Sequence, residues 1–448
     1  MPDPVPAPAV PARPPSRLFR QGLLRAALAV NAHRPVHHNR LLTLPSFVTS
    51  LPTTEAAPVL LATWVVRTAW EARRRGRPSA GDLVGLALTA AASAGLVQSM
   101  RDGARADEEL HAALASLVPG EYLDRRPHSV RSGAWFPWMD GRSRRRKTRG
   151  VVYSELDTHR LKLDVYEPLD KATNGAKRPA IMQIHGGAWV VGSKDEQGVP
   201  LLNHLAANGW VGFNVEYRLS PKAKFPSHLV DCKAALTWIR AHADDYGIDP
   251  DFIAVTGGSA GGHLAALMAL TENDPAFQPG FESADTSVQA AVPFYGVYDL
   301  LDREGDHADV YLAFMEQLVM GSHPDADPEG WASYSPIDRI HGDAPPMMIL
   351  HGDNDVLVPV AGARRFAAAV RHASSNPVVY AELHGAQHAF DLFPSIRTVR
   401  TIEYVERFLS WVHGHHLAPA DRRDRATRPV QDAPDTVVED SGTVAVGG

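Results

Sequence analysis

The sequence predicts an α/β protein, in which a mainly parallel sheet is covered by helices on both faces and preceded by an amino-terminal helical region. Two observations favour this class. From about residue 150, short apolar stretches typical of buried strands alternate with segments of helical periodicity, the order that joins parallel strands through helices. Before residue 150, the apolar stretches are longer and almost free of charge, as in helices.

The first 40 residues are basic and contain many prolines. Their arginines are spread along the segment, at Arg13, Arg17, Arg20, Arg25, Arg34 and Arg40. They lack the compact order of basic, apolar and cleavage-site regions that defines a secretory signal peptide. We expect residues 1–40 to form a basic, partly disordered arm.

Residues 41–150 contain two candidate membrane segments, at about 41–66 and 83–100. Glu55 is the one charge that interrupts the first segment, and the second has 18 residues without any charge. A spanning helix needs about 20 mainly apolar residues, but much of the second segment is Ala, Gly, Ser or Thr. Two interpretations stay open, a hairpin inserted in a membrane or a helical pair packed on the following domain.

The arginines between these two segments bear on membrane orientation. Residues 67–77 are dense in arginine, which is typical of a cytoplasmic loop and would put the following domain outside the cytoplasm. The basic amino-terminal arm argues for the opposite orientation. The topology is therefore open, and a cytoplasmic protein is the alternative to one associated with a membrane through residues 41–100.

A run of basic residues at 142–149 is typical of a solvated linker and indicates a domain boundary near residue 150. In the following domain, residues 151–416, strands are expected at 161–166, 180–185, 211–217, 252–256, 288–294, 347–351 and 378–383. Helices are expected at about 228–242, 260–271, 360–373 and 396–413. Residues 417–448 lack apolar periodicity, so we expect a disordered tail.

The most informative motif surrounds Ser259. An apolar strand at 252–256 leads into Gly-Gly-Ser-Ala-Gly-Gly at 257–262, and a helix-forming run follows. A serine hydroxyl is a weak nucleophile, so it must project from a tight turn where a base reaches it, and the turn needs glycine where side chains would collide. Gly257 and Gly261 occupy those positions, which predicts Ser259 as a nucleophile.

A second strand ends in His-Gly-Gly-Ala-Trp at residues 185–189, upstream of Ser259. When a serine attacks an ester carbonyl, negative charge develops on the oxygen, and backbone N–H groups can stabilise it. We assign this oxyanion hole to Gly186, Gly187 and Ala188, with the N–H groups of Gly187, Ala188 and Ala260 as the donors. A simple strand-terminating turn is the alternative interpretation.

Two later loops offer the acid and the base. Asp355 follows the strand at 347–351, and His388 follows the strand at 378–383, in the order serine, aspartate, histidine. His388 would accept the proton of Ser259, and Asp355 would hold the imidazole in the correct tautomer. Asp353 and His384 are the rival assignments, and we favour Asp355 and His388 because they lie deeper in their loops.

Together these motifs resemble the α/β-hydrolase superfamily, specifically the hormone-sensitive-lipase-like and feruloyl-esterase-like branches of carboxylesterases and lipases. The resemblance covers about residues 150–415 and also includes Glu-Tyr-Arg-Leu-Ser-Pro at 216–221. It implies an α/β-hydrolase fold, an acyl-enzyme mechanism without a cofactor or metal, and Ser259, Asp355 and His388 as the triad. The first of these branches usually has a third glycine at the position of Ala188, which favours the second branch.

We therefore expect a serine carboxylesterase or lipase that hydrolyses small-molecule or lipid esters. An arylformamidase-like or other amide hydrolase is the alternative, because the same triad serves any acyl transfer. A non-catalytic interaction protein on the same scaffold is a further alternative. A formal net charge of -6 argues against nucleic acid as a partner, and oligomeric state is not indicated.

Overall fold

The computed structural model describes residues 16–37, 39, 41–74, 77–125, 145–156, 159–170, 176–307 and 310–418. Its centre is an eight-stranded sheet in the order β1-β2-β4-β3-β5-β6-β7-β8. Strands β3 to β8 run parallel, and β2 is antiparallel to both of its neighbours. The strands are β1 (Arg145–Leu156), β2 (His159–Pro168), β3 (Arg178–Ile184), β4 (Val211–Val215), β5 (Ile248–Gly258), β6 (Ala290–Phe294), β7 (Met347–Gly352) and β8 (Val378–Leu383).

Helices cover both faces of this sheet, because alternate side chains of each strand enter two different cores. On β3, Met182 packs into one core, with residues of α7, α9 and α12, and Ile181 packs into the other, with residues of α4, α6 and α13. The part of the chain from β1 to the last helix is called the catalytic region below. Its helices are α6 (Val199–Ala207), α7 (Ser227–Ala241), α8 (Ala243–Tyr246), α9 (Ala260–Leu270), α10 (Tyr311–Phe314), α11 (Pro328–Ser333), α12 (Val360–Ala373) and α13 (Ile396–Leu417). The predicted α/β class is confirmed.

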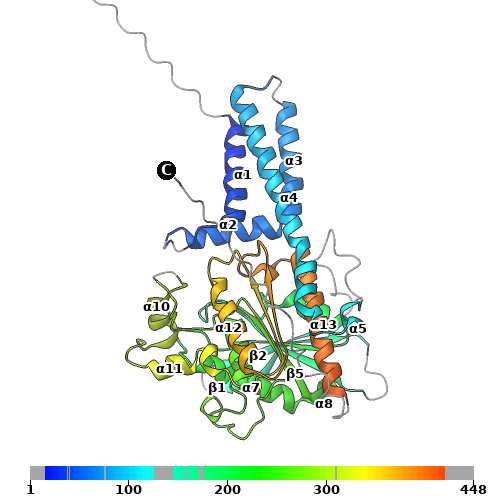
Figure 1. Ribbon diagram of the computed structural model, residues 1–448, viewed down its shortest axis with the longest axis vertical. Helices are drawn as coiled ribbons and strands as arrows, with labels where there is room; N and C mark the ends of the chain where they lie inside the picture. The colour runs from blue at the N-terminus through cyan, green and yellow to red at the C-terminus, as the bar shows by residue number, and fades with distance from the viewer. Residues whose placement is uncertain are drawn as a thin grey trace, which may run out of the picture.

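The amino-terminal region consists of helices that rise from one end of the sheet. Figure 1 shows α1, α3 and the first half of α4 side by side as a column, with α2 lying across its base. The 36-residue α4 then continues downward to pack on α13. The bounds are α1 (Arg17–His33), α2 (Thr43–Glu55), α3 (Ala57–Arg74), α4 (Ala80–Ala115) and α5 (Gly120–Leu123).

Three details of this region differ from the sequence-based expectations. Residues 17–33 of the expected arm form α1, while residues 1–15 lie outside the described part of the chain. The segment expected at 41–66 is two helices that meet at Ala56. The structure describes one helix, α4, that is long and apolar enough to cross a membrane, and only 28% of its most apolar stretch is buried within the protein.

The basic run at 142–149 is not wholly a linker. From Arg145 it is part of β1, an edge strand that pairs antiparallel with β2. Charged side chains suit an edge strand because they discourage pairing with other chains, and here Arg146 pairs with Glu167 across the strands at 2.5 Å. The sheet therefore begins about six residues before the expected boundary. Residues 142–144 and 419–448, the latter most of the expected tail, lie outside the described residues.

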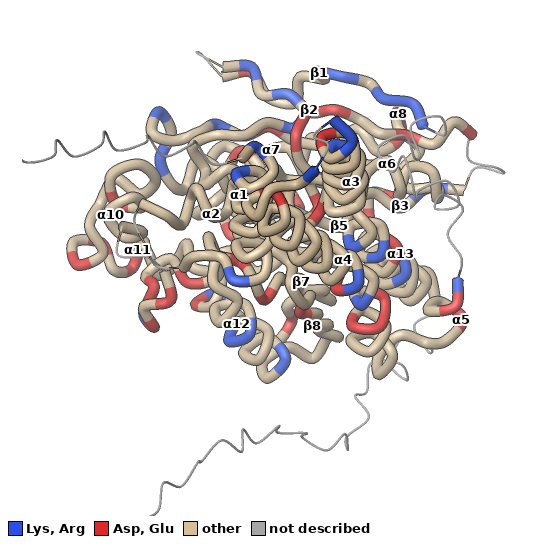
Figure 2. The backbone as a smooth tube through the Cα atoms, turned by 90° about the horizontal axis from the view of Figure 1, so that it is seen from above, with Lys and Arg blue, Asp and Glu red and all other residues tan. Residues whose placement is uncertain are grey.

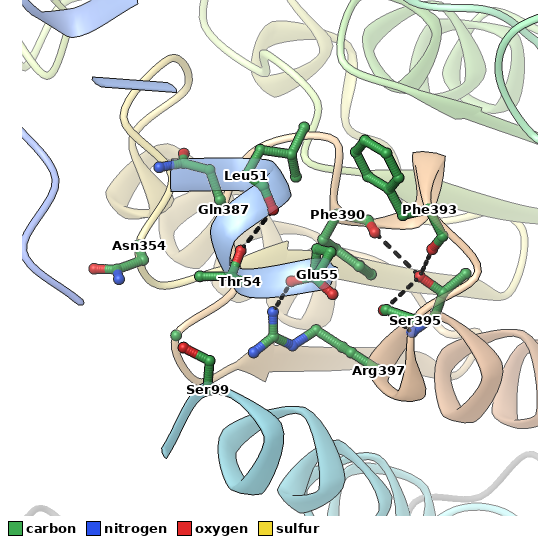
Figure 3. Close-up of polar contacts among 12 residues, drawn as sticks. Leu51, Thr54, Glu55, Ser99, Asn354, Gln387, Phe390, Phe393, Ser395 and Arg397 are labelled. Carbon is green, nitrogen blue, oxygen red and sulfur yellow. Dashed lines mark hydrogen bonds and ion pairs between the residues drawn. The ribbon is translucent and has the colours of Figure 1, made fainter. Parts of the chain in front are cut away.

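A buried ion pair joins the amino-terminal helices to the catalytic region. Glu55, at the end of α2, pairs with Arg397 in the first turn of α13, and each side chain is 2% exposed (Figure 3). Arg397 also donates a hydrogen bond to the His384 carbonyl at 3.0 Å. The helical region and the sheet are thus held together by a charged contact as well as by apolar packing.

Candidate active site

Ser259 lies on a sharp turn between the end of β5 and the start of α9. Its backbone has φ 59° and ψ −122°, a strained conformation for a residue with a side chain. The Ser259 N–H donates to the Phe294 carbonyl at 3.0 Å, which fixes the turn against β6. A Cβ on Gly261 would lie 2.1 Å from the Ile184 carbonyl oxygen, so this position requires glycine. The turn projects the hydroxyl beyond the carboxyl ends of the strands.

His388 connects Ser259 to Asp355 through both nitrogens of its ring. Its Nε2 lies 2.9 Å from Ser259 Oγ, and its Nδ1 lies 2.6 Å from Asp355 Oδ2. In this arrangement the Nδ1–H donates to the carboxylate, which leaves Nε2 free to accept the serine proton. The three predicted residues therefore come together, from the loops that follow β5, β7 and β8.

Asp355 is buried and held as a carboxylate by its surroundings. Burial raises its pKa, but His388 and then His351 outweigh this effect, so the pKa lies well below its usual range. The N–H groups of Leu357 and Val358 donate to Oδ1 at 2.9 and 2.8 Å, and His351 Nε2 lies 3.3 Å from Oδ2. Asp355 can therefore stabilise a positively charged His388 imidazolium.

The rival residues Asp353 and His384 form a separate pair. His384 Nδ1 lies 2.8 Å from Asp353 Oδ2, and the Gly385 N–H donates to Asp353 Oδ1 at 2.7 Å. This pair fastens the loop after β7 to the loop after β8. It makes no contact with Ser259 among the interactions of the described residues, which agrees with the preference for Asp355 and His388.

The loop at 185–189 lies against Ser259, because a Cβ on Gly186 would approach Ser259 Cβ to 3.0 Å. Gly187 and Ala188 have φ values of 114° and 52°. The hydrogen bonds of the described residues leave the N–H groups of Gly187, Ala188 and Ala260 without an acceptor. Gly186 differs from the expectation, since its N–H donates to Gln197 Oε1 at 2.5 Å, so it shapes the loop instead of supplying a donor.

Several residues that support the site were not identified from the sequence. Gln387 Oε1 accepts hydrogen bonds from the N–H groups of Val356 and His388, both at 2.9 Å, so it ties the acid loop to the base loop. Its Nε2 donates to Ser50 Oγ on α2 at 3.0 Å, and Figure 3 shows Gln387 beside α2. No motif spacing signals a glutamine of this kind, because its partners are distant in sequence.

Two aromatic side chains enclose His388. The Tyr295 ring lies 4.7 Å from the imidazole between centroids, and its hydroxyl donates to Asp391. Phe47 of α2 also meets the imidazole edge-on, at 6.0 Å between ring centroids. The amino-terminal helices therefore contribute directly to the surroundings of the catalytic base.

Fold and site together define a serine hydrolase of the α/β type. Comparison with known proteins is consistent with this class. Residues 163–370 match the BD-FAE family model. The chain is 42% identical to the probable carboxylic ester hydrolase LipM of Mycobacterium tuberculosis, over 88% of this chain and 93% of that protein. It is 43% identical to esterase LipQ of the same organism, over 70% and 76%.

Solved structures agree with these relatives. Esterase 2 of Thermogutta terrifontis superimposes with a TM-score of 0.51 at 32% identity, over 60% of this chain and 95% of that one. A further structure records the same esterase phosphorylated by paraoxon, with a TM-score of 0.50 at 30% identity, over 61% and 96%. The chain belongs to the α/β-hydrolase superfamily of carboxylesterases and lipases, and it is a serine hydrolase acting on carboxylic esters.

Proposed function

We propose that Ser259 is the nucleophile, His388 the general base and acid, and Asp355 the residue that orients and stabilises His388. The proposal rests on two consecutive hydrogen bonds: Ser259 Oγ lies 2.9 Å from His388 Nε2, and His388 Nδ1 lies 2.6 Å from Asp355 Oδ2. His388 Nε2 takes the proton as Ser259 Oγ bonds to the carbonyl carbon. The N–H groups of Gly187, Ala188 and Ala260 stabilise the charge on the carbonyl oxygen.

The tetrahedral intermediate then collapses to an acyl-enzyme. The bond between the carbonyl carbon and the alkoxide breaks, and His388 returns its proton to the leaving alcohol. Water next attacks the acyl group, giving its proton to His388, and the same donors stabilise the second intermediate. The bond between the carbonyl carbon and Ser259 Oγ then breaks, and His388 returns its proton to Ser259 Oγ. The products are a carboxylic acid, an alcohol and free Ser259, so the cycle needs no cofactor.

For the substrate we propose a neutral acyl ester of small-molecule or lipid origin. The relatives' names support ester hydrolysis in general. A lipid origin is supported by Phe47 against His388 and by the exposed Leu44 and Val48 on the same helix, which offer an apolar approach to the site. These side chains would contact acyl chains without recognising a polar group.

The direct test is hydrolysis of p-nitrophenyl esters from acetyl to palmitoyl, alongside an aryl amide. We expect Ser259→Ala to reduce kcat by about a million-fold and to abolish labelling by a fluorophosphonate probe. Ser193→Ala, which removes a hydroxyl after the oxyanion loop, is the matched control and should keep both. Persistent labelling of Ser259→Ala would contradict the assignment, and turnover of the amide alone would contradict the substrate class.

A further inference from the structure

The column formed by α1, α3 and the first half of α4 exposes apolar side chains and buries polar ones. Fourteen of the 22 large exposed hydrophobic residues in the described chain lie between residues 23 and 84. On the column they are Leu23, Leu24, Val30, Val59, Val65, Val66, Trp70, Leu83 and Val84. Soluble proteins rarely gather so many exposed apolar side chains in one region, so the column needs a partner.

The interior of the column holds polar groups beside a small apolar cluster that includes Trp64 and Leu96. Arg25 is 5% exposed and donates to Thr68 at 2.6 Å and to Thr89 at 3.3 Å. Gln21 donates to the buried Glu71 at 2.8 Å. Polar side chains of all three helices therefore meet inside the column, while Thr63 and Arg67 of α3 stay exposed. Ionisable residues inside membrane helices face the bundle interior in the same way.

Helices α1 and α4 also cross unusually closely. A Cβ on Gly22 would lie 2.3 Å from the Gly85 carbonyl oxygen, and one on Gly85 would lie 2.4 Å from the Leu18 carbonyl oxygen. Small residues at a helix crossing are typical of membrane bundles, where close backbone packing replaces the hydrophobic effect between helices. This contact is therefore a third, independent indication of a lipid environment.

The dimensions and charges of the column match a bilayer. The charge-free stretch 83–100 of α4 has 18 residues, about 27 Å as a helix, beside a hydrocarbon core of about 30 Å. At the tip of the column the exposed charged residues are arginines, namely Arg17, Arg20, Arg73, Arg74 and Arg77, and Figure 2 shows this blue end from above. Arg74 lies over the half-exposed Trp70 ring at 4.0 Å, a pairing suited to the headgroup region.

Helix α2 continues the pattern at the base of the column. It buries Ser46, Ser50 and Thr54 against the protein and exposes Leu44 and Val48 on its outer side. A helix that exposes aliphatic side chains in this way is suited to the surface of an apolar phase. Since it lies across the column in Figure 1, it marks the level at which the membrane ends.

We infer that the first half of α4, the described helix apolar enough to span, crosses a lipid bilayer with α1 and α3 packed against it, and that α2 lies at the membrane surface on the side of the catalytic region. The arginine tip then lies on the cytoplasmic side and the active site on the opposite side. This arrangement reduces the conflict between the two basic segments, because Arg17 and Arg20 at the start of α1 lie at the same end as Arg73, Arg74 and Arg77, although Arg34 follows the other end of α1. The inference does not depend on the roles of Ser259, Asp355 and His388.

The first experiment measures membrane retention of the full chain in a bacterial expression host. We expect the protein to stay in the membrane pellet after washing with sodium carbonate, and its release into the supernatant would overturn the inference. Leu24→Asp, at a position 62% exposed, should move the protein out of the membrane. The same change at Leu169, 60% exposed on the catalytic region, is the control and should change nothing.

The second experiment determines topology by cysteine labelling and does not require a disruptive variant. The native Cys232 is fully buried, so it gives no background. In intact spheroplasts a membrane-impermeant maleimide should label Asp325→Cys on the catalytic region and should label Arg77→Cys at the tip only after permeabilisation. Labelling of both sites in intact spheroplasts, of neither, or of Arg77→Cys alone would each overturn the assigned arrangement.

Discussion

At the scale of single residues, the site depends on which carboxylate contacts which imidazole. Asp355 and Asp353 are two positions apart, yet Asp355 meets His388 and Asp353 meets His384. Asp355 also accepts two backbone N–H groups, so its orientation is fixed independently of His388. The two carboxylates therefore form a natural pair for mutagenesis.

We expect Asp355→Asn to lower kcat for ester hydrolysis by about four orders of magnitude, because an amide at this position favours the wrong imidazole tautomer. Asp353→Asn retains an oxygen that can accept from Gly385, so its kcat should stay within a few-fold of wild type. Steady-state kinetics on a p-nitrophenyl ester measures both variants. The reverse ranking would show that Asp353 is the acid.

His263 links the site to acid stability. It is buried just after Ser259, and its Nε2 donates to the Tyr334 carbonyl at 2.8 Å. Burial lowers its pKa to about 4, against a smaller opposing effect of that carbonyl. Because the unfolded chain binds a proton near pH 6.5, the contribution of a neutral His263 is fully present above that pH and is lost as the pH falls toward 4.

Between pH 7 and pH 5 this histidine should reduce the free energy of unfolding by about 2 kcal/mol. We expect His263→Gln to lose less stability than wild type over that interval, as measured by thermal unfolding in the same detergent at both pH values. In His372→Gln, which changes an exposed histidine, the free energy of unfolding should depend on pH as it does in wild type. The same pH dependence in His263→Gln would contradict the assignment of His263 as a neutral, buried histidine.

At the scale of helices and strands, the sequence predicted the catalytic region well and the amino-terminal region poorly. Strands such as β5 and β7 are buried on both faces, so they are continuous apolar runs between turn residues. Helix α1 was missed because Leu23 and Leu24 are exposed while Arg25 is buried. Strand β1 was missed because its charged side chains lie at an edge.

The catalytic motifs were predictable because their chemistry restricts residue type and local spacing. The supporting contacts were not, since they depend on segments that meet only in the folded chain. Gln387 forms hydrogen bonds with Ser50 and Val356, and His351 lies beside the Asp355 carboxylate. The residues next to Gln387 and His351 in the sequence form no motif that signals these contacts. Their roles are defined by tertiary packing.

The crossing of α1 and α4 provides a test at this scale. Gly22→Ala places a Cβ 2.3 Å from the Gly85 carbonyl oxygen, so the two helices must separate, at a cost of about 1–3 kcal/mol. Gly81→Ala lies in the same bundle, and its Cβ would have 3.8 Å to the nearest atom. Thermal unfolding followed by circular dichroism should show a lower midpoint for Gly22→Ala alone. Equal midpoints would contradict the close crossing.

At the scale of the whole molecule, the Glu55–Arg397 pair joins the amino-terminal helices to the catalytic region. Both charges are withdrawn from water, so removal of either leaves the other buried without compensation. Asn354 of the loop after β7 also donates a hydrogen bond to the Ala32 carbonyl of α1 at 3.3 Å. A truncation within α4, for instance of residues 1–105, would therefore disturb the catalytic region as well as remove the column.

We expect Glu55→Gln and Arg397→Met each to destabilise the protein by about 3–5 kcal/mol. The double variant should lose less than the sum of the two, because no unpaired charge remains. Unfolding free energies of the four proteins form a double-mutant cycle that measures the coupling. Strict additivity would indicate that the two side chains do not interact.

The continuous α4 has a kinetic consequence for the enzyme. Its 36 residues, about 54 Å of unbroken helix, run from the arginine tip into the core beside α13. In the membrane arrangement inferred above, the second half holds Ser259 at a constant height and tilt above the leaflet. Encounters with a lipid ester then become a two-dimensional search by lateral diffusion. The rate of hydrolysis would follow the mole fraction of ester in the membrane, and dilution with inert lipid would slow it at constant bulk concentration.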